Sequence, residues 1–275
     1  FLFFFFFFKQ KTAYDIRSCD WSSDVCSSDL EKFKTPMIFA VNKLDDDSAD
    51  FDKTVREAKA HFGNKVVVVQ YPRQSGSGFH EIIDVLRMTM YKFKDNGGKP
   101  EKLPIPDDEK TKADELHKEL IEAIASNDES LMEKYFDKGE LDEDEMKMGM
   151  KKAMISHDIF PLFCLSAERN MGSGRLMGFI DNVCPSANEM PAQTTRRGDK
   201  LPCDANGPAC IFIYKTVSEP HVGELSFFKV YSGTVRSGME LENETTGVTE
   251  KLTQLFLVEG NKRTNVNELV AGDIG

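Results

Sequence analysis

The chain has 275 residues, 40% of them hydrophobic, which is enough for one large domain or two small ones with a real hydrophobic core. The formal net charge of −11 argues against DNA and against any nucleic acid held by bulk charge, but it leaves room for an RNA contacted through local patches. Six cysteines without CxxC or Cys/His ligand spacing predict reduced thiols in a cytoplasmic protein, with no metal centre.

The first thirty residues follow no helix or strand period. Residues 1–8 are apolar, and a segment rich in Ser, Asp and Cys follows at 19–30. A signal peptide would need a basic region before mixed aliphatic residues, and eight apolar residues cannot span a membrane. The stretch resembles translated sequencing-adapter sequence. We therefore expect 1–30 to be a non-native, disordered tail, and we expect the residues that naturally precede Glu31 to be missing.

A short apolar run at 36–41 ends abruptly at Asn42-Lys43-Leu44-Asp45. This pattern indicates a buried parallel strand with a polar site at its carboxyl end. A carboxylate such as Asp45 can accept two parallel hydrogen bonds from guanine N1–H and N2–H₂, which adenine does not offer there. Asn42 can donate to N7, and the stem of Lys43 can lie over the base. The motif resembles the base-recognition motif of GTP-binding proteins. A plain polar turn after a core strand is the alternative.

Residues 51–62 have apolar spacing typical of a helix, and the β-branched run 65–70 predicts a second buried strand. The order strand, helix, strand predicts a parallel α/β unit with a right-handed crossover. The loop 75–78 is rich in glycine but lacks the Lys-Ser/Thr pair of a phosphate loop, so we interpret it as a turn. Residues 79–91 fit either a hairpin or a short helix.

An acidic helical segment follows, with helices predicted at 111–125, 129–137 and 142–156. Their exposed faces carry most of the negative excess of the chain. A solvated helical surface is one interpretation, and a docking surface for a basic partner is the other.

The apolar run 159–165 predicts another buried strand, which ends at Ser166-Ala167 before a helix at 176–183. A backbone N–H in such a turn can donate to guanine O6, and small side chains let the base approach. Paired with Asn42, Lys43 and Asp45, the residues Ser166 and Ala167 complete a predicted guanine site.

The run 115–185 resembles translation elongation factor G. The stretches 122–135 (EAIASNDESLMEKY) and 160–172 (FPLFCLSAERNMG) resemble its insert subdomain and its fifth guanine-nucleotide motif, although the family commonly has Gly where this chain has Leu165. The residues at 69–72 and 88–93 resemble those of a divergent paralogue group related to elongation factor G. The resemblance implies GTP or GDP as ligand, an insert that meets the ribosomal stalk protein, and a role in translocation during protein synthesis.

Short strands at 209–216, 223–231 and 251–258 follow a polar linker and predict an antiparallel barrel. The stretches 221–233 and 271–275 resemble the second domain of elongation factor G, which implies contact with small-subunit rRNA. The predicted fold is thus the C-terminal half of a P-loop-type GTPase domain of α/β class, with a helical insert, followed by an incomplete antiparallel β-barrel. The expected domains are 1–30 (tail), 31–98 with 159–187 (partial GTP-binding domain), 99–158 (insert), 188–208 (linker) and 209–275 (truncated barrel).

No G-x-x-x-x-G-K-[ST] phosphate loop occurs in the sequence, and the D-x-x-G matches at 95–98 and 204–207 follow the base motif, in the wrong chain order. No histidine spacing suggests catalysis. We therefore assign no catalytic residues and no Mg²⁺ ligands, and we expect weak nucleotide binding or none. The parent would be a ribosome-associated GTPase. A ribosome-binding paralogue that does not hydrolyse GTP and an inert fragment are the alternatives.

Overall fold

The computed structural model describes residues 5–7, 36–95, 97–195, 198–219, 223–259 and 262–275. The chain divides into two compact units, Leu2–Cys184 and Pro185–Gly275. Each unit has a hydrophobic core of its own.

The first unit is built on a sheet with the strand order β1-β2-β8-β3. Its strands are β1 (Phe5–Phe7), β2 (Ile38–Val41), β3 (Val66–Val68) and β8 (Phe160–Cys164). Strand β8 runs parallel to both β2 and β3, and every residue of these three strands is buried. Continuous burial is typical of parallel sheets covered on both faces. The buried parallel strands predicted in the runs 36–41 and 159–165 are therefore confirmed.

Strand β1 differs from the expectation for residues 1–30. Phe5–Phe7 pairs in parallel with the first three residues of β2, whereas the sequence predicted no regular structure there. Without this segment β2 would be an edge strand, and an extended apolar segment can satisfy the backbone groups of an open edge. The other residues of the predicted tail, 1–4 and 8–30, lie outside the described residues.

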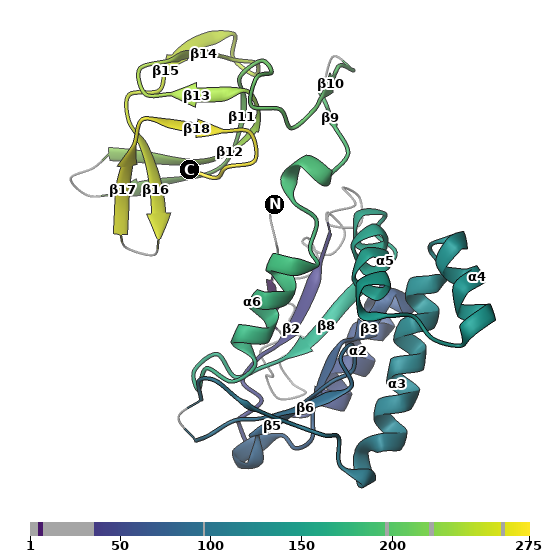
Figure 1. Cartoon of the computed structure of the whole chain (residues 1–275). Helices are drawn as coiled ribbons and strands as arrows, with labels where there is room; N and C mark the ends of the chain where they lie inside the picture. The colour runs from purple at the N-terminus through teal and green to yellow at the C-terminus, as the bar shows by residue number, and fades with distance from the viewer. Residues whose placement is uncertain (1–4, 8–35, 96, 196–197, 220–222, 260–261) are drawn as a thin grey trace. The chain divides into compact units, whose positions relative to one another are not determined.

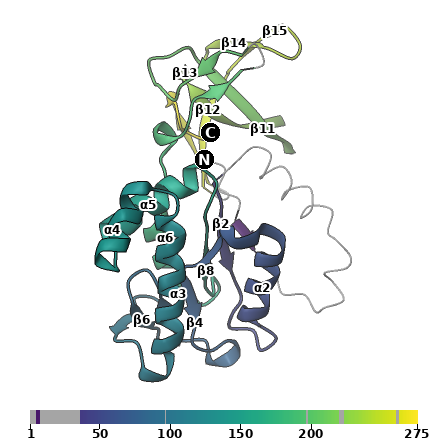
Figure 2. The same ribbon diagram turned by 90° about the vertical axis from the view of Figure 1, so that its right-hand side faces the viewer.

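Helices α2 (Phe51–Phe62) and α6 (Ser173–Asn182) cover opposite faces of this sheet (Figure 1; Figure 2). The ring of Phe62 lies 5.0 Å from that of Phe39 on β2, and the ring of Phe179 lies 4.8 Å from that of Phe163 on β8. Helix α2 begins at the predicted residue because the side chain of Asp50 caps the N–H of Lys53.

A second, antiparallel sheet contains β4 (Gln70–Pro72), β5 (Glu81–Asp84), β6 (Thr89–Lys92) and β7 (Glu101–Leu103) in that order. The segment 79–91, which fitted a hairpin or a helix, is a hairpin. The run 65–70 is not one strand. Val69 lies where the chain passes from the first sheet to the second. Its N–H donates to the carbonyl of Leu162 on β8, and its own carbonyl accepts from the N–H of Val85, which directly follows β5. Short 3₁₀ turns occupy Gly63–Lys65 and Gly76–Gly78.

The predicted helical segment contains α3 (Asp107–Ala125), α4 (Glu129–Lys138) and α5 (Glu143–Ile155). Helix α3 begins earlier than the predicted Thr111, because three acidic residues occupy its first turn and interact favourably with the helix dipole. Asp142 and Glu145 form a capping box at the start of α5. No helix in the described part of the chain combines the length and the apolar character that a membrane span needs.

The second unit is antiparallel β structure. Its strand pairs are β9 (Gln193–Thr194) with β10 (Lys200–Leu201), β11 (Cys210–Glu219) with β12 (Gly223–Ser232), β13 (Thr234–Arg236) with β18 (Glu268–Val270), β14 (Glu240–Asn243) with β15 (Val248–Lys251), and β16 (Leu255–Glu259) with β17 (Lys262–Val266). The predicted strand 251–258 is wrong as a single element, because the chain leaves β15 after Lys251 and re-enters a strand only at Leu255. A 3₁₀ turn lies at Ala187–Glu189.

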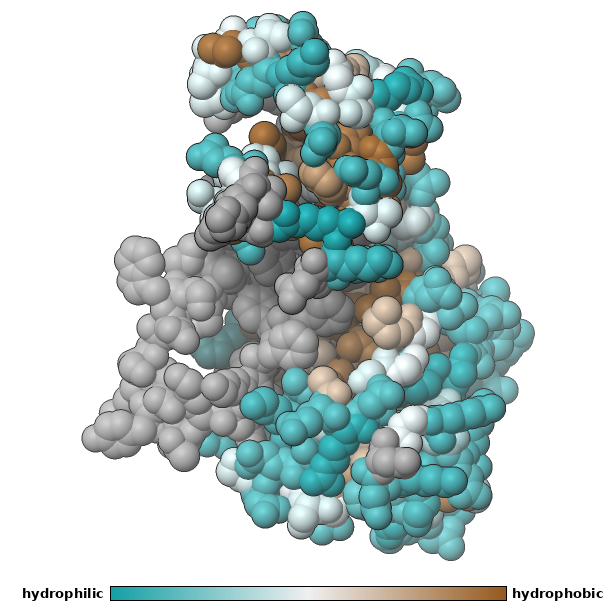
Figure 3. Space-filling view, turned by 90° about the vertical axis from the view of Figure 1, so that its left-hand side faces the viewer, coloured by the Kyte–Doolittle hydropathy of each residue, from teal (hydrophilic) through white to brown (hydrophobic). Residues whose placement is uncertain are grey.

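The core of this unit is small; among its described residues the buried apolar side chains are those of Phe228, Val230, Val235, Leu255 and Leu269. Large apolar side chains remain exposed on β11, and Figure 3 shows apolar residues at the surface of this unit. The predicted fold class, parallel α/β followed by antiparallel β, is confirmed.

Candidate functional site

The loop after β2 presents the first half of the predicted site. Lys43 has the left-handed φ of 62°, which is uncommon for a residue other than glycine. This turn places Leu44 in the core, where it is 1% exposed, and leaves the side chain of Asp45 16% exposed. The backbone of Leu44 donates to the carbonyl of Leu165 and accepts from the N–H of Gly76 at 2.8 Å. The loop is therefore anchored both to the next strand and to the glycine-rich turn at 76–78.

The loop after β8 presents the second half. Ser166 is fully buried, and its backbone exchanges two hydrogen bonds of 2.9 Å with Met171. Its hydroxyl oxygen also accepts from the N–H of Arg169 at 3.2 Å. Gly172 closes the turn with a φ of 84°, and a Cβ there would lie 2.7 Å from the carbonyl oxygen of Cys164. The turn therefore has a defined backbone that only glycine can close at this point.

The two loops meet because β2 and β8 are neighbours, with Val41 opposite Cys164. Across the gap, the N–H of Ala167 donates to Oδ1 of Asn42 at 2.9 Å. Since the backbone group is the donor, the amide oxygen of Asn42 faces Ala167 and its NH₂ group is directed elsewhere. The structure thus brings Asn42, Lys43 and Asp45 beside Ser166 and Ala167. Their role in reading guanine stays a prediction.

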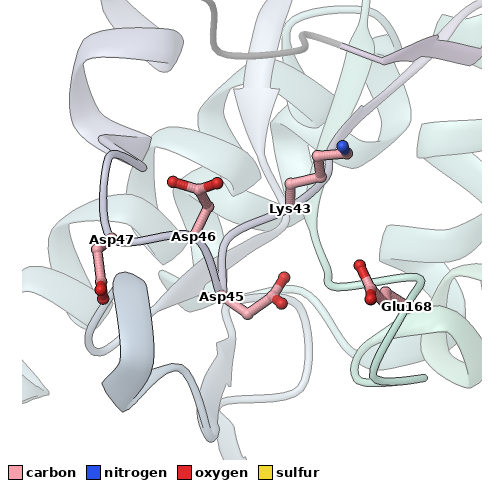
Figure 4. Close-up of a pocket in the computed structure, with 5 residues that line it drawn as sticks. All are labelled: Lys43, Asp45, Asp46, Asp47 and Glu168. Atoms are coloured by element: carbon pink, nitrogen blue, oxygen red, sulfur yellow. The ribbon is translucent and has the colours of Figure 1, made fainter.

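A depression of about 370 Å³ lies at this junction and is lined by Lys43, Asp45, Asp46, Asp47 and Glu168 (Figure 4). Asp45 and Glu168 point toward one another from the two loops, whereas Asp47 points to the opposite side. Sequence reasoning did not single out Asp46, Asp47 or Glu168. Their positions next to the two motifs were the available signal.

The other aspartates of this loop stabilise local turns. Oδ1 of Asp47 accepts from the N–H of Ser77 at 2.9 Å. Asp46 accepts from the hydroxyl and the N–H of Ser48, and the hydroxyl bond is the main reason that the pKa of Asp46 is lowered. Asp45 is different, because its Oδ2 lies 3.2 Å from Nε of Arg169. Asp45 is therefore the carboxylate of this loop that faces the second loop.

An ion pair between Asp84 and Arg175 stabilises the C-terminal end of the loop after β8. Asp84 on β5 is fully buried, and its Oδ2 accepts from Nε and Nη2 of Arg175 at 2.9 and 2.6 Å. Its Oδ1 accepts from the N–H of Arg87, and its Oδ2 also accepts from Nε2 of Gln70. Because Arg175 belongs to the first turn of α6, directly after Gly172, this pair fixes where the loop ends. Sequence reasoning missed both partners.

In the described part of the chain, no group of three or more His, Cys, Asp or Glu side chains has the arrangement of a metal site.

Comparison with known proteins identifies the C-terminal region. Residues 208–275 match the family model described as Elongation factor G domain 2. The fold is similar to a crystal structure of a protein from Thermus thermophilus, with a TM-score of 0.73 and 24% sequence identity over 91% of this chain. The matched region covers 35% of that longer chain, and at this identity the likeness shows the fold alone. The predicted resemblance of the C-terminal region is confirmed: residues 208–275 are similar to domain 2 of elongation factor G.

Proposed function

We propose that this chain is the guanine-reading part of a translational GTPase of the elongation factor G type, which promotes translocation on the ribosome. The observation that carries the proposal is the hydrogen bond between Ala167 and Asn42, which joins the Asn-Lys-x-Asp loop to the Ser-Ala loop. The elongation factor G domain 2 in the same chain supports it.

Each residue has a distinct part in the proposed recognition of GTP or GDP. Asp45 accepts from N1–H and N2–H₂ of guanine, and the NH₂ group of Asn42 donates to N7. The aliphatic stem of Lys43 covers one face of the base. Ser166 holds the turn, and the small Ala167 lets the base approach a backbone N–H. A site that hydrogen-bonds its substrate in this way rejects an analogue lacking the partner groups by a factor of about 10⁴.

The proposal covers base recognition and includes no hydrolytic step. Hydrolysis needs phosphate-binding backbone groups and Mg²⁺ ligands, and no phosphate-loop motif occurs in the sequence. Affinity for nucleotide should therefore be weak, with dissociation constants in the millimolar range as an order of magnitude, because the base alone makes few contacts.

The proposed partners are ribosomal, in the cytoplasm. The domain at 208–275 supports contact with small-subunit rRNA. Helices α3, α4 and α5 carry exposed acidic residues, among them Asp107, Glu129 and Asp144. These acidic residues would bind a basic surface of the stalk protein.

Base selectivity tests the proposal. Isotope-labelled chain would be titrated with GDP and, separately, with ADP, each to several millimolar, while the backbone amide signals of residues 42–45 and 166–170 are followed by NMR. We expect GDP to shift these signals saturably and ADP to leave them unchanged. Equal shifts with both nucleotides, or no shift with either, would overturn the assignment of a guanine site.

A further inference from the structure

An arginine from the second loop reaches the carboxylate that would read the base. Nε of Arg169 lies 3.2 Å from Oδ2 of Asp45, and the two side chains are 36% and 16% exposed. The pair bridges the two loops beside the hydrogen bond between Ala167 and Asn42. Arg169 was not among the predicted site residues.

The chemistry of this contact resembles the contact proposed for guanine. The N1–C2–N2 edge of guanine is a planar guanidine unit that offers two parallel N–H donors, and an arginine side chain ends in the same unit. A carboxylate accepts from either group, but the same oxygen cannot face both at once. We propose that Arg169 competes with guanine for Asp45 and so acts as an internal latch on the base site, an inference that rests on the function proposed above.

The backbone of Arg169 is fixed, so the latch can open through side-chain rotation alone. Its N–H donates to the hydroxyl oxygen of Ser166. Its carbonyl oxygen lies so close to Gly97 that a Cβ at that glycine would come within 1.9 Å of it. The turn that carries Arg169 is thus held from two sides. Release of Asp45 requires a new rotamer of Arg169 and no movement of the loop.

The surrounding charges give the released guanidinium a second partner. Glu168 lines the same depression and points toward Asp45, while Lys43 borders the depression from the first loop (Figure 4). A released Arg169 can therefore pair with Glu168 while the base occupies Asp45. Because partly exposed ion pairs are weak, the latch lowers the affinity for guanine by about two- to fivefold.

Substitution of Arg169 tests the proposal on the 275-residue chain, with GDP as the probe. We expect Arg169→Ala to bind GDP about two- to fivefold more tightly than the wild type, and Arg169→Gln, which keeps a donor without the charge, to lie between them. The control is Arg236→Ala, which removes an exposed arginine paired with Glu268 in the other unit and should not change GDP affinity. Loss of a cation near an anionic nucleotide would by itself weaken binding, so the expected sign is opposite to a bulk-charge effect.

A second measurement observes the latch directly. The Nε–H signal of Arg169 in an NMR spectrum should move toward that of an unpaired arginine as GDP is added, and ADP should leave it in place. Preferential binding of GDP with equal or weaker affinity in Arg169→Ala would overturn the latch while leaving the guanine site intact. Absence of any preference for GDP over ADP in the wild type would instead overturn the proposed function, and the latch with it.

Discussion

The buried ion pair between Asp84 and Arg175 gives the sharpest stability prediction. Replacing Arg175 with Ala would leave the fully buried carboxylate of Asp84 without its counter-charge. Removing one partner of a buried pair costs about 3–5 kcal/mol. Gln70 and the N–H of Arg87 still donate to Asp84, so we expect the lower end, about 3 kcal/mol of unfolding free energy.

Urea unfolding followed by the helical circular dichroism signal is the appropriate assay, because helices α2 to α6 all lie in the first unit. The matched control is Arg87→Ala. Its Nε lies 2.9 Å from Glu143, but these side chains are 34% and 44% exposed, and such pairs contribute about 0–1 kcal/mol. A double replacement, Asp84→Leu with Arg175→Met, should recover much of the loss. If Arg175→Ala cost no more than Arg87→Ala, the assigned support for the second loop would be wrong.

Two further predictions concern titratable groups. Hydrogen bonds from Lys152 and then from Ser130 hold the pKa of Asp128 well below its usual range. This carboxylate therefore contributes stability above about pH 4, and that contribution is lost as the pH falls further. The Asp128→Asn variant should show a smaller drop in melting temperature between pH 7 and pH 3 than the wild type. An equal drop in both proteins would contradict this prediction. Burial raises the pKa of Cys184 to about 12 and that of Cys164 well above its ordinary value. At pH 8 a thiol reagent should label Cys203, which is half-buried, before either of them, as peptide mass spectrometry would show; equal rates would refute the assigned burial.

Local patterns sufficed for the elements that a single segment determines. The apolar run before Asn42 and the run before Ser166 each predict a buried strand, and both strands form as neighbours in one parallel sheet. Helix α2 spans the residues that the apolar spacing at 51–62 predicts, and Asp50 caps its first turn. The points where the two apolar runs end also located the two loops, because strand ends in such sheets lie at one edge.

The missed features depend on contacts between distant segments. Nothing near Asp84 in the sequence indicates that Arg175, 91 residues away, neutralises it. The pairing of Arg169 with Asp45 likewise needs the two strands to be adjacent first. The run 65–70 looks like one strand, but Val69 donates to Leu162 on β8 of the first sheet and accepts from Val85, which directly follows β5 of the second sheet. In each case tertiary contacts decide the structure and override the local pattern.

The exchange of Asp45 for asparagine tests the central claim most directly. The amide of the new side chain would offer one donor and one acceptor, which matches the C2 carbonyl and N1–H of xanthine and no longer matches guanine. In an NMR competition on the 275-residue chain, we expect the wild type to prefer GDP over xanthosine diphosphate and the Asp45→Asn variant to reverse that order. An unchanged preference for GDP in the variant would show that Asp45 does not read the base.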